Sequence, residues 1–117
     1  MTNSELKFSG RERRRAERIR VNFRAQWQGS WAQREGYITD LSITGCFILT
    51  PDLVSPGETV KLGIHLPKGE IKLEGRVIYK VEDMGFAIEF TSASEDDRKH
   101  LLWLIKAEAR MAMRRPK

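Results

Sequence analysis

Apolar and polar residues alternate along most of the chain, in short segments that turn residues separate. From Ile19 to Trp27 every second residue is apolar, which is the period of a strand with one face in a core. The same pattern predicts five further strands, at residues 36–41, 45–50, 59–66, 71–77 and 85–90. Turn signals such as Ser55-Pro56-Gly57 stand between them. This regular spacing predicts an all-β fold, a six-stranded antiparallel barrel that is closed or split.

The end of the chain changes to a helical period. Ser94 is suited to cap a helix, with acidic residues in the first turn and Asp97 at the third helical position. Apolar residues then follow at helical spacing, namely Leu101, Leu104, Ile105, Ala109 and Met113. We expect one helix over about residues 94–113. It packs on the barrel or across one mouth, or pairs with its copy in a second chain, and Met111 and Met113 serve this packing.

The 117 residues are enough for one domain, and 32% charged with 40% hydrophobic residues is typical of a soluble globular protein. Residues 1–24 contain eight of the 21 lysines and arginines and three of the 16 acids, so the formal charge of +5 falls entirely in this segment. We expect residues 1–12 to form a flexible arm and residues 13–117 a single domain. Without an apolar span or secretory signal, the expected location is the cytoplasm, with no membrane insertion.

The chain contains few residues of the types that commonly perform catalysis. Cys46, the single cysteine, lies in an apolar strand and is expected to be a buried, inert thiol. His65 and His100 are expected on polar faces, and no motif for a metal, a nucleophile or a phosphate-cradling loop occurs. The sequence therefore predicts a protein that is not an enzyme and holds no metal or cofactor.

Two short motifs carry chemical information. The first is Arg14-Arg15-Ala16-Glu17-Arg18, in which arginines four residues apart can converge on one anion. The second is Asp40-Leu41-Ser42-Ile43-Thr44-Gly45, in which a carboxylate and a hydroxyl on one face can read the N–H edge of a guanine. Gly45 permits a close backbone approach or a positive φ. The hexapeptide is equally well suited to a turn with local hydrogen bonds.

Together these motifs resemble the PilZ family, bacterial receptors for the second messenger cyclic di-GMP. The resemblance covers about residues 11–113 and includes the Gly85-Phe86 strand and the closing helix. It implies a PilZ-like six-stranded barrel with a C-terminal helix. It further implies a cyclic di-GMP site in which arginines grip phosphates and guanines and the second motif contacts a guanine. The residues it assigns are Arg14, Arg18, Asp40, Ser42 and Gly45, with help from Arg13 and Arg15.

On this reading the arginine arm becomes ordered on the ligand and changes the surface that an effector protein binds, in motility or biofilm regulation. The protein is expected to be a monomer or weak dimer and to bind no DNA or RNA. Two alternatives stay open. One is a small basic β-barrel that binds single-stranded nucleic acid, with Trp27, Trp31, Tyr37 and Phe47 as stacking platforms. The other is an adaptor of the same fold that works without a nucleotide.

Overall fold

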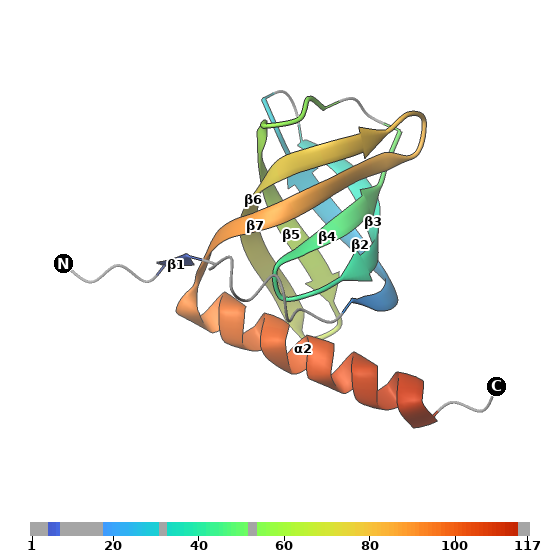
Figure 1. Ribbon diagram of the computed structural model, residues 1–117. Helices are drawn as coiled ribbons and strands as arrows, with labels where there is room; N and C mark the ends of the chain where they lie inside the picture. The colour runs from blue at the N-terminus through green and yellow to red at the C-terminus, as the bar shows by residue number, and fades with distance from the viewer. Residues whose placement is uncertain (1–4, 8–17, 31–32, 52–53, 115–117) are drawn as a thin grey trace.

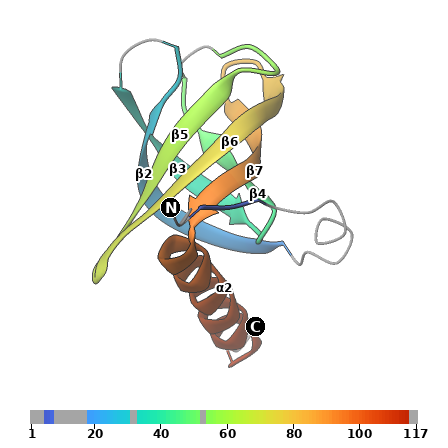
Figure 2. The same ribbon diagram turned by 90° about the vertical axis from the view of Figure 1, so that its left-hand side faces the viewer.

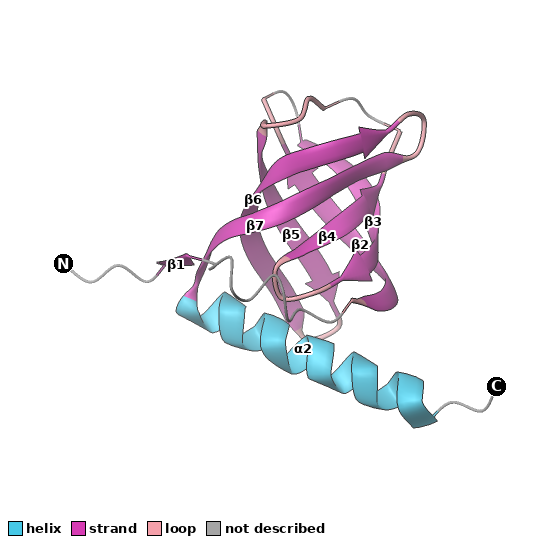
Figure 3. Cartoon of the chain, in the orientation of Figure 1, coloured by secondary structure: helices cyan, strands magenta, loops and turns pink. Residues whose placement is uncertain are grey.

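The computed structural model describes residues 5–7, 18–30, 33–51 and 54–114. These residues form seven strands and one helix (Figure 1; Figure 3). The strands are β1 (Glu5–Lys7), β2 (Ile19–Gln28), β3 (Gln33–Leu41), β4 (Gly45–Leu49), β5 (Thr59–Leu66), β6 (Gly69–Val81) and β7 (Gly85–Ser94). The helix is α2 (Glu95–Arg114).

Strands β2 to β7 close into an antiparallel barrel. The order is β7-β4-β3-β2-β5-β6, and β6 pairs with β7 to complete the circuit. All pairings are antiparallel, as short connections between successive strands require. The prediction of a six-stranded antiparallel barrel followed by one helix is confirmed.

Strand β1 is an element that the hydrophobic pattern did not predict. It pairs with the last residues of β7, with Lys7 opposite Ser92 and Glu5 opposite Ser94. It lies inside the segment interpreted as a flexible arm, and three residues are too few to show a period. The division into an arm at residues 1–12 and a domain from residue 13 stays a prediction.

The barrel interior is filled by the inward-facing residue of each alternating pair. Ile38, Ile48, Ile64 and Phe86 are fully buried, and each contributes about 1.5–3 kcal/mol by leaving water. Trp27 is also buried, and its ring meets that of Phe86 edge to face with centroids 5.0 Å apart. The interpretation of Trp27 as a stacking platform is therefore wrong, because its ring belongs to the core.

Helix α2 begins with the cap that the sequence predicts. The backbone N–H of Asp97 donates to Ser94 Oγ at 3.0 Å, and Ser94 Oγ donates to Asp97 Oδ2 at 2.8 Å. The first half of the helix packs across one end of the barrel, where it meets β1, β2, β6 and β7 (Figure 2). Leu101, Leu104 and Ile105 are buried there.

The second half of α2 extends past the barrel (Figure 1). Met113 is 87% exposed and Met111 50% exposed, so of the two packing roles expected for them the one on the barrel is wrong for Met113, and pairing with a second chain stays a prediction. The exposure has a geometric reason: a helix of 20 residues is about 30 Å long, longer than the end of the barrel that it crosses. Among the described residues no helical stretch has the length and hydropathy that a membrane crossing requires.

Candidate functional site

The second motif lies where β3 ends and the chain turns into β4. Ser42 donates its backbone N–H to the carbonyl of Gly45 at 2.9 Å, which closes the turn. Its hydroxyl oxygen accepts the backbone N–H groups of Thr44 and Gly45, at 3.1 and 3.2 Å. The hydroxyl lies 3.1 Å from Thr44 Oγ1 and 3.3 Å from the Gly45 carbonyl oxygen, the two acceptors available to its proton. Ser42 therefore organises the turn.

Burial also distinguishes Ser42 from the other polar residue of the motif. Ser42 is 2% exposed, whereas Asp40 is partly exposed on the outer face of β3. A hydroxyl has one proton and two lone pairs, and the turn already uses this capacity. The local role expected of a turn serine is thus present, and a direct contact between Ser42 and a ligand stays a prediction.

Gly45 is needed because two backbones approach closely. A Cβ at this position would overlap the carbonyl oxygen of Ile88, on the neighbouring strand β7. The φ of Gly45 is not positive, so of the two reasons given for a glycine here the close approach is the one that holds. The partner in the approach is β7, and contact between Gly45 and a ligand stays a prediction.

Asp40 belongs to a row of outward-facing residues that crosses five strands. Its neighbours are Arg20 on β2 and Phe47 on β4, and the row continues through Ala87 on β7 to Tyr79 on β6. A β-bulge between Ile38 and Asp40 produces this placement, because it shifts the alternation of β3 by one residue. Leu41 then points into the core and Asp40 out.

This row adds to the candidate site Arg20, which sequence reasoning missed, and Phe47, which it named only as a stacking platform for a single-stranded nucleic acid. Arg20 is exposed and Phe47 is partly exposed. In the sequence Arg20 is the polar half of an alternating pair, and Phe47 resembles a core residue. Only the pairing of β2 with β3 and of β3 with β4 shows that each lies beside Asp40.

Arg18 is the residue of the arginine motif that the structure describes. It is exposed and directly precedes Ile19, whose partner across the β2–β3 pairing is Leu41. The second motif therefore starts beside Arg18. Burial raises the pKa of the Cys46 thiol far above its ordinary value, and the positive charge of Arg18 acts in the opposite direction. The expectation that Cys46 is a buried thiol is confirmed.

Arg13, Arg14 and Arg15 lie outside the described residues. Lys7, paired with Ser92 on β7, and Arg18, next to the β2–β3 pairing, are the described residues on either side of them.

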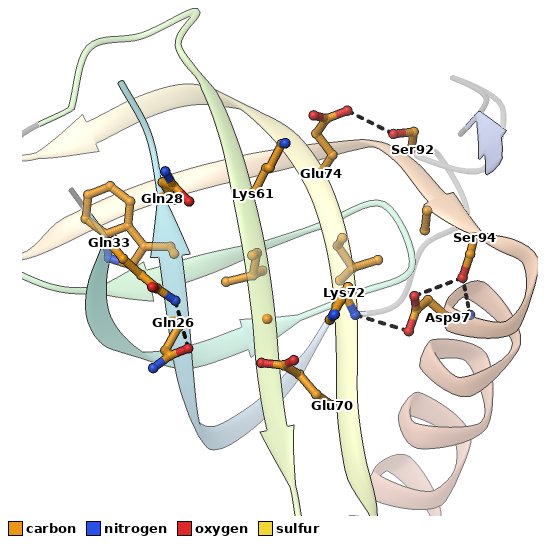
Figure 4. Close-up of a pocket in the computed structure, with 15 residues that line it drawn as sticks. Gln26, Gln28, Gln33, Lys61, Glu70, Lys72, Glu74, Ser92, Ser94 and Asp97 are labelled. Atoms are coloured by element: carbon orange, nitrogen blue, oxygen red, sulfur yellow. Dashed lines mark hydrogen bonds between the residues drawn. The ribbon is translucent and has the colours of Figure 1, made fainter. Parts of the chain in front are cut away.

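A separate groove of about 500 Å³ lies on the outer faces of β2, β5 and β6, next to the first turn of α2 (Figure 4). Three amides line one side, and Gln33 Nε2 donates to Gln26 Oε1 at 2.8 Å. On the other side Ser92 Oγ donates to Glu74 Oε1, and Lys72 donates its backbone N–H to Asp97 Oδ1. Two lysines and three acids line this groove, so it is not the basic track that a nucleic acid requires.

The described residues contain no cluster of three or more His, Cys, Asp or Glu side chains that suits a metal ion. His65 is partly exposed, with Nε2 3.8 Å from Glu70 Oε2. His100 lies on the surface of α2 with its ring centroid 6.1 Å from that of Trp103. Neither histidine lies in the row through Asp40, which contains one carboxylate and one arginine.

The fold defines a class, a small antiparallel β-barrel closed by one helix, and the row through Asp40 is its candidate site. The sequence profile of the PilZ domain matches residues 12–107, and the chain belongs to the PilZ domain family. No curated protein sequence matches the chain significantly.

Solved structures agree on the fold. The inhibitor of motility MotI/DgrA of Bacillus subtilis has a TM-score of 0.70 at 21% identity, covering 86% of this chain. The chain spans about half of that protein, 52% of its length. The PilZ domain of Escherichia coli YcgR with c-di-GMP has a TM-score of 0.64 at 20% identity, covering 86% of this chain and 94% of the other. The PilZ domain of CeSA from a cellulose-synthesizing bacterium has a TM-score of 0.62 at 20% identity, covering 78% and 96%.

Proposed function

We propose that the chain is a cytoplasmic receptor for cyclic di-GMP that acts by binding and carries out no reaction. The observation that supports this best is the β2–β3 register. Ile19 opposite Leu41 and Arg20 opposite Asp40 bring the end of the arginine motif to the start of the Asp40–Gly45 motif. Arg18 and Asp40, which are 22 residues apart in the sequence, are thereby brought to the same end of the β2–β3 pairing.

The chemistry of this region suits a compact anion with purine rings. Arg18 is an exposed guanidinium, able to bind a phosphate through two N–H groups or to stack on a ring. The Asp40 carboxylate can accept hydrogen bonds from the N1 and N2 donors of a guanine. Phe47 beside it offers an aromatic face.

In this proposal Arg14 reaches the same ligand from the preceding segment, with Arg13 and Arg15 close by. Ser42 contributes by fixing the turn that presents Asp40 and Gly45. Each charge-assisted hydrogen bond to the ligand contributes about 1.5–3 kcal/mol. Arginines that repel one another without ligand are neutralised by its two phosphates, so binding favours an ordered arm. The changed surface is what an effector protein would recognise, and YcgR, whose PilZ domain is solved with c-di-GMP, is consistent with this class of ligand.

Isothermal titration calorimetry with cyclic di-GMP tests the proposal. We expect Arg18→Ala to weaken binding by tenfold or more, because one charged contact is lost. Arg24→Ala is a matched control, since Arg24 is also exposed on β2 but lies opposite Tyr37, away from the motif. A flat titration of the wild type at tens of micromolar would contradict the proposal.

Salt dependence separates the nucleotide from a polymer. A dinucleotide with two phosphates gives a shallow decrease of affinity with salt, and a long single strand gives a steep one. Binding of an effector protein that survives Arg18→Ala would instead favour an adaptor that works without the nucleotide.

A further inference from the structure

Exposed large apolar side chains are confined to two surfaces of the described part of the chain. Six lie on β3, β4 and β6 and in the β6–β7 turn, and three lie on α2. The first set, called the sheet patch below, is Tyr37, Leu49, Ile78, Tyr79, Val81 and Met84. The second set is Trp103, Met111 and Met113. Each side chain is at least 39% exposed.

Three members of the sheet patch share one cross-strand row, and Tyr79 lies two residues before Val81 on the same face of β6. Tyr37 lies opposite Leu49, Leu49 opposite Gly85 and Gly85 opposite Val81. Gly85 adds no side chain to the row, and a Cβ there would overlap the carbonyl oxygen of Ile48. With about 200 Å² for a whole large side chain and roughly half of each exposed, the patch presents about 500 Å². Patches of this size on a monomer are often functional.

The charge beside the patch indicates what it can bind. Glu82 and Asp83 form the exposed tip of the β6–β7 hairpin, and Lys80 supplies one opposing charge. This end of the patch is therefore acidic in a protein with a formal charge of +5. At the other end of the row Arg24 is exposed opposite Tyr37, so the acidic border is confined to the hairpin tip. That tip favours a partner that is apolar and basic.

The projecting half of α2 has these properties. Trp103, Ala107 and Met111 are spaced four residues apart, so they follow one another as a stripe on successive turns of α2, and Trp103 and Met111 are exposed. Lys106 and Arg110 are exposed beside this stripe. The stripe is about 12 Å long at 1.5 Å per residue, and four strands at about 4.8 Å spacing are about 14 Å wide. The two surfaces therefore match in size, and Lys106 and Arg110 complement the acidic hairpin tip.

A chain cannot bring its own two surfaces together. Helix α2 lies at one end of the barrel and the β6–β7 hairpin at the other, in both views (Figure 1; Figure 2). We propose that α2 of one chain docks on the sheet patch of a second copy of the chain. Each copy offers both surfaces, so two copies can exchange helices around a twofold axis and bury both stripes.

Mixing of two variants in sedimentation velocity tests this arrangement, without nucleotide. Trp103→Ala damages the helix surface, and Leu49→Lys places a positive charge in the sheet patch. Both residues are exposed, so the variants should keep the fold, which circular dichroism verifies. We expect the wild type to form dimers as its concentration rises, and each variant alone to dimerise at least tenfold more weakly.

The mixture is the decisive sample. It pairs an intact helix with an intact sheet patch, so we expect an equimolar mixture to recover a dimer with one working interface. Gln28→Lys, an exposed charge on β2 outside both surfaces, is the control and should dimerise like the wild type. Two results would overturn the proposal: a wild type that stays monomeric at millimolar concentration, or variants that fail to complement. The second result would indicate contacts of helix with helix or sheet with sheet.

Discussion

Ser42 and Asp40 stand two residues apart in one motif, yet the structure assigns them opposite physical roles. Ser42→Ala removes the acceptor of two backbone N–H groups, those of Thr44 and Gly45. At a site only 2% exposed, water replaces that acceptor poorly. With about 1 kcal/mol or slightly more for each N–H left unpaired, the free energy of unfolding should fall by about 2–3 kcal/mol.

For a domain of this length such a loss lowers the melting temperature by about 10 °C. Asp40→Ala should change the melting temperature by no more than about 2 °C, because the Asp40 side chain is partly exposed and takes no part in the hydrogen bonds of the turn. The same variant should weaken cyclic di-GMP binding by tenfold or more. Thermal denaturation and calorimetric titration of both variants measure the two quantities separately.

Thr44→Val is the control for the turn. It removes one of the two acceptors available to the Ser42 proton and leaves the Gly45 carbonyl oxygen, at 3.3 Å, as the other. We expect a loss below about 1 kcal/mol. If Ser42→Ala kept the wild-type melting temperature and lost only ligand affinity, the structural role derived for Ser42 would be refuted.

Three further outcomes can be measured on the free protein. Gly45→Ala should lower the free energy of unfolding by about 2–4 kcal/mol, because β4 must move away from the Ile88 carbonyl. In Gly63→Ala the new methyl group meets only the flexible end of the Glu70 side chain, so the free energy of unfolding should change little. Glu58 accepts backbone hydrogen bonds that lower its pKa below the ordinary 4.5, so Glu58→Gln should lower stability at pH 7. That difference should vanish as the pH falls through the folded-state pKa, as thermal melts of both proteins would show. Cys46 should resist thiol reagents at pH 8 in the native state and react in denaturant, because burial raises its pKa.

Local patterns predicted the elements well, because each depends on neighbouring residues. The alternation from Ile19 to Trp27 and the Ser94 cap are confirmed. The patterns failed where contacts between residues distant in the sequence determine whether an element forms or a side chain is buried. Strand β1 has only three residues and forms because it pairs with β7. Met113 continues the apolar spacing of α2, but it is exposed because the helix there has passed the end of the barrel.

The chain's own residues were thus sufficient to determine a barrel, a closing helix and two motifs with a shared chemistry. Only the folded molecule decided how the motifs are used. The β2–β3 register brings Arg20 to Asp40, and the bulge after Ile38 turns Asp40 outward. The turn uses the hydrogen-bonding capacity of Ser42. The physical reason is that the spacing of apolar residues along the sequence predicts which residues share one face of a strand or helix. The pairing between distant strands determines which residues of different strands become neighbours.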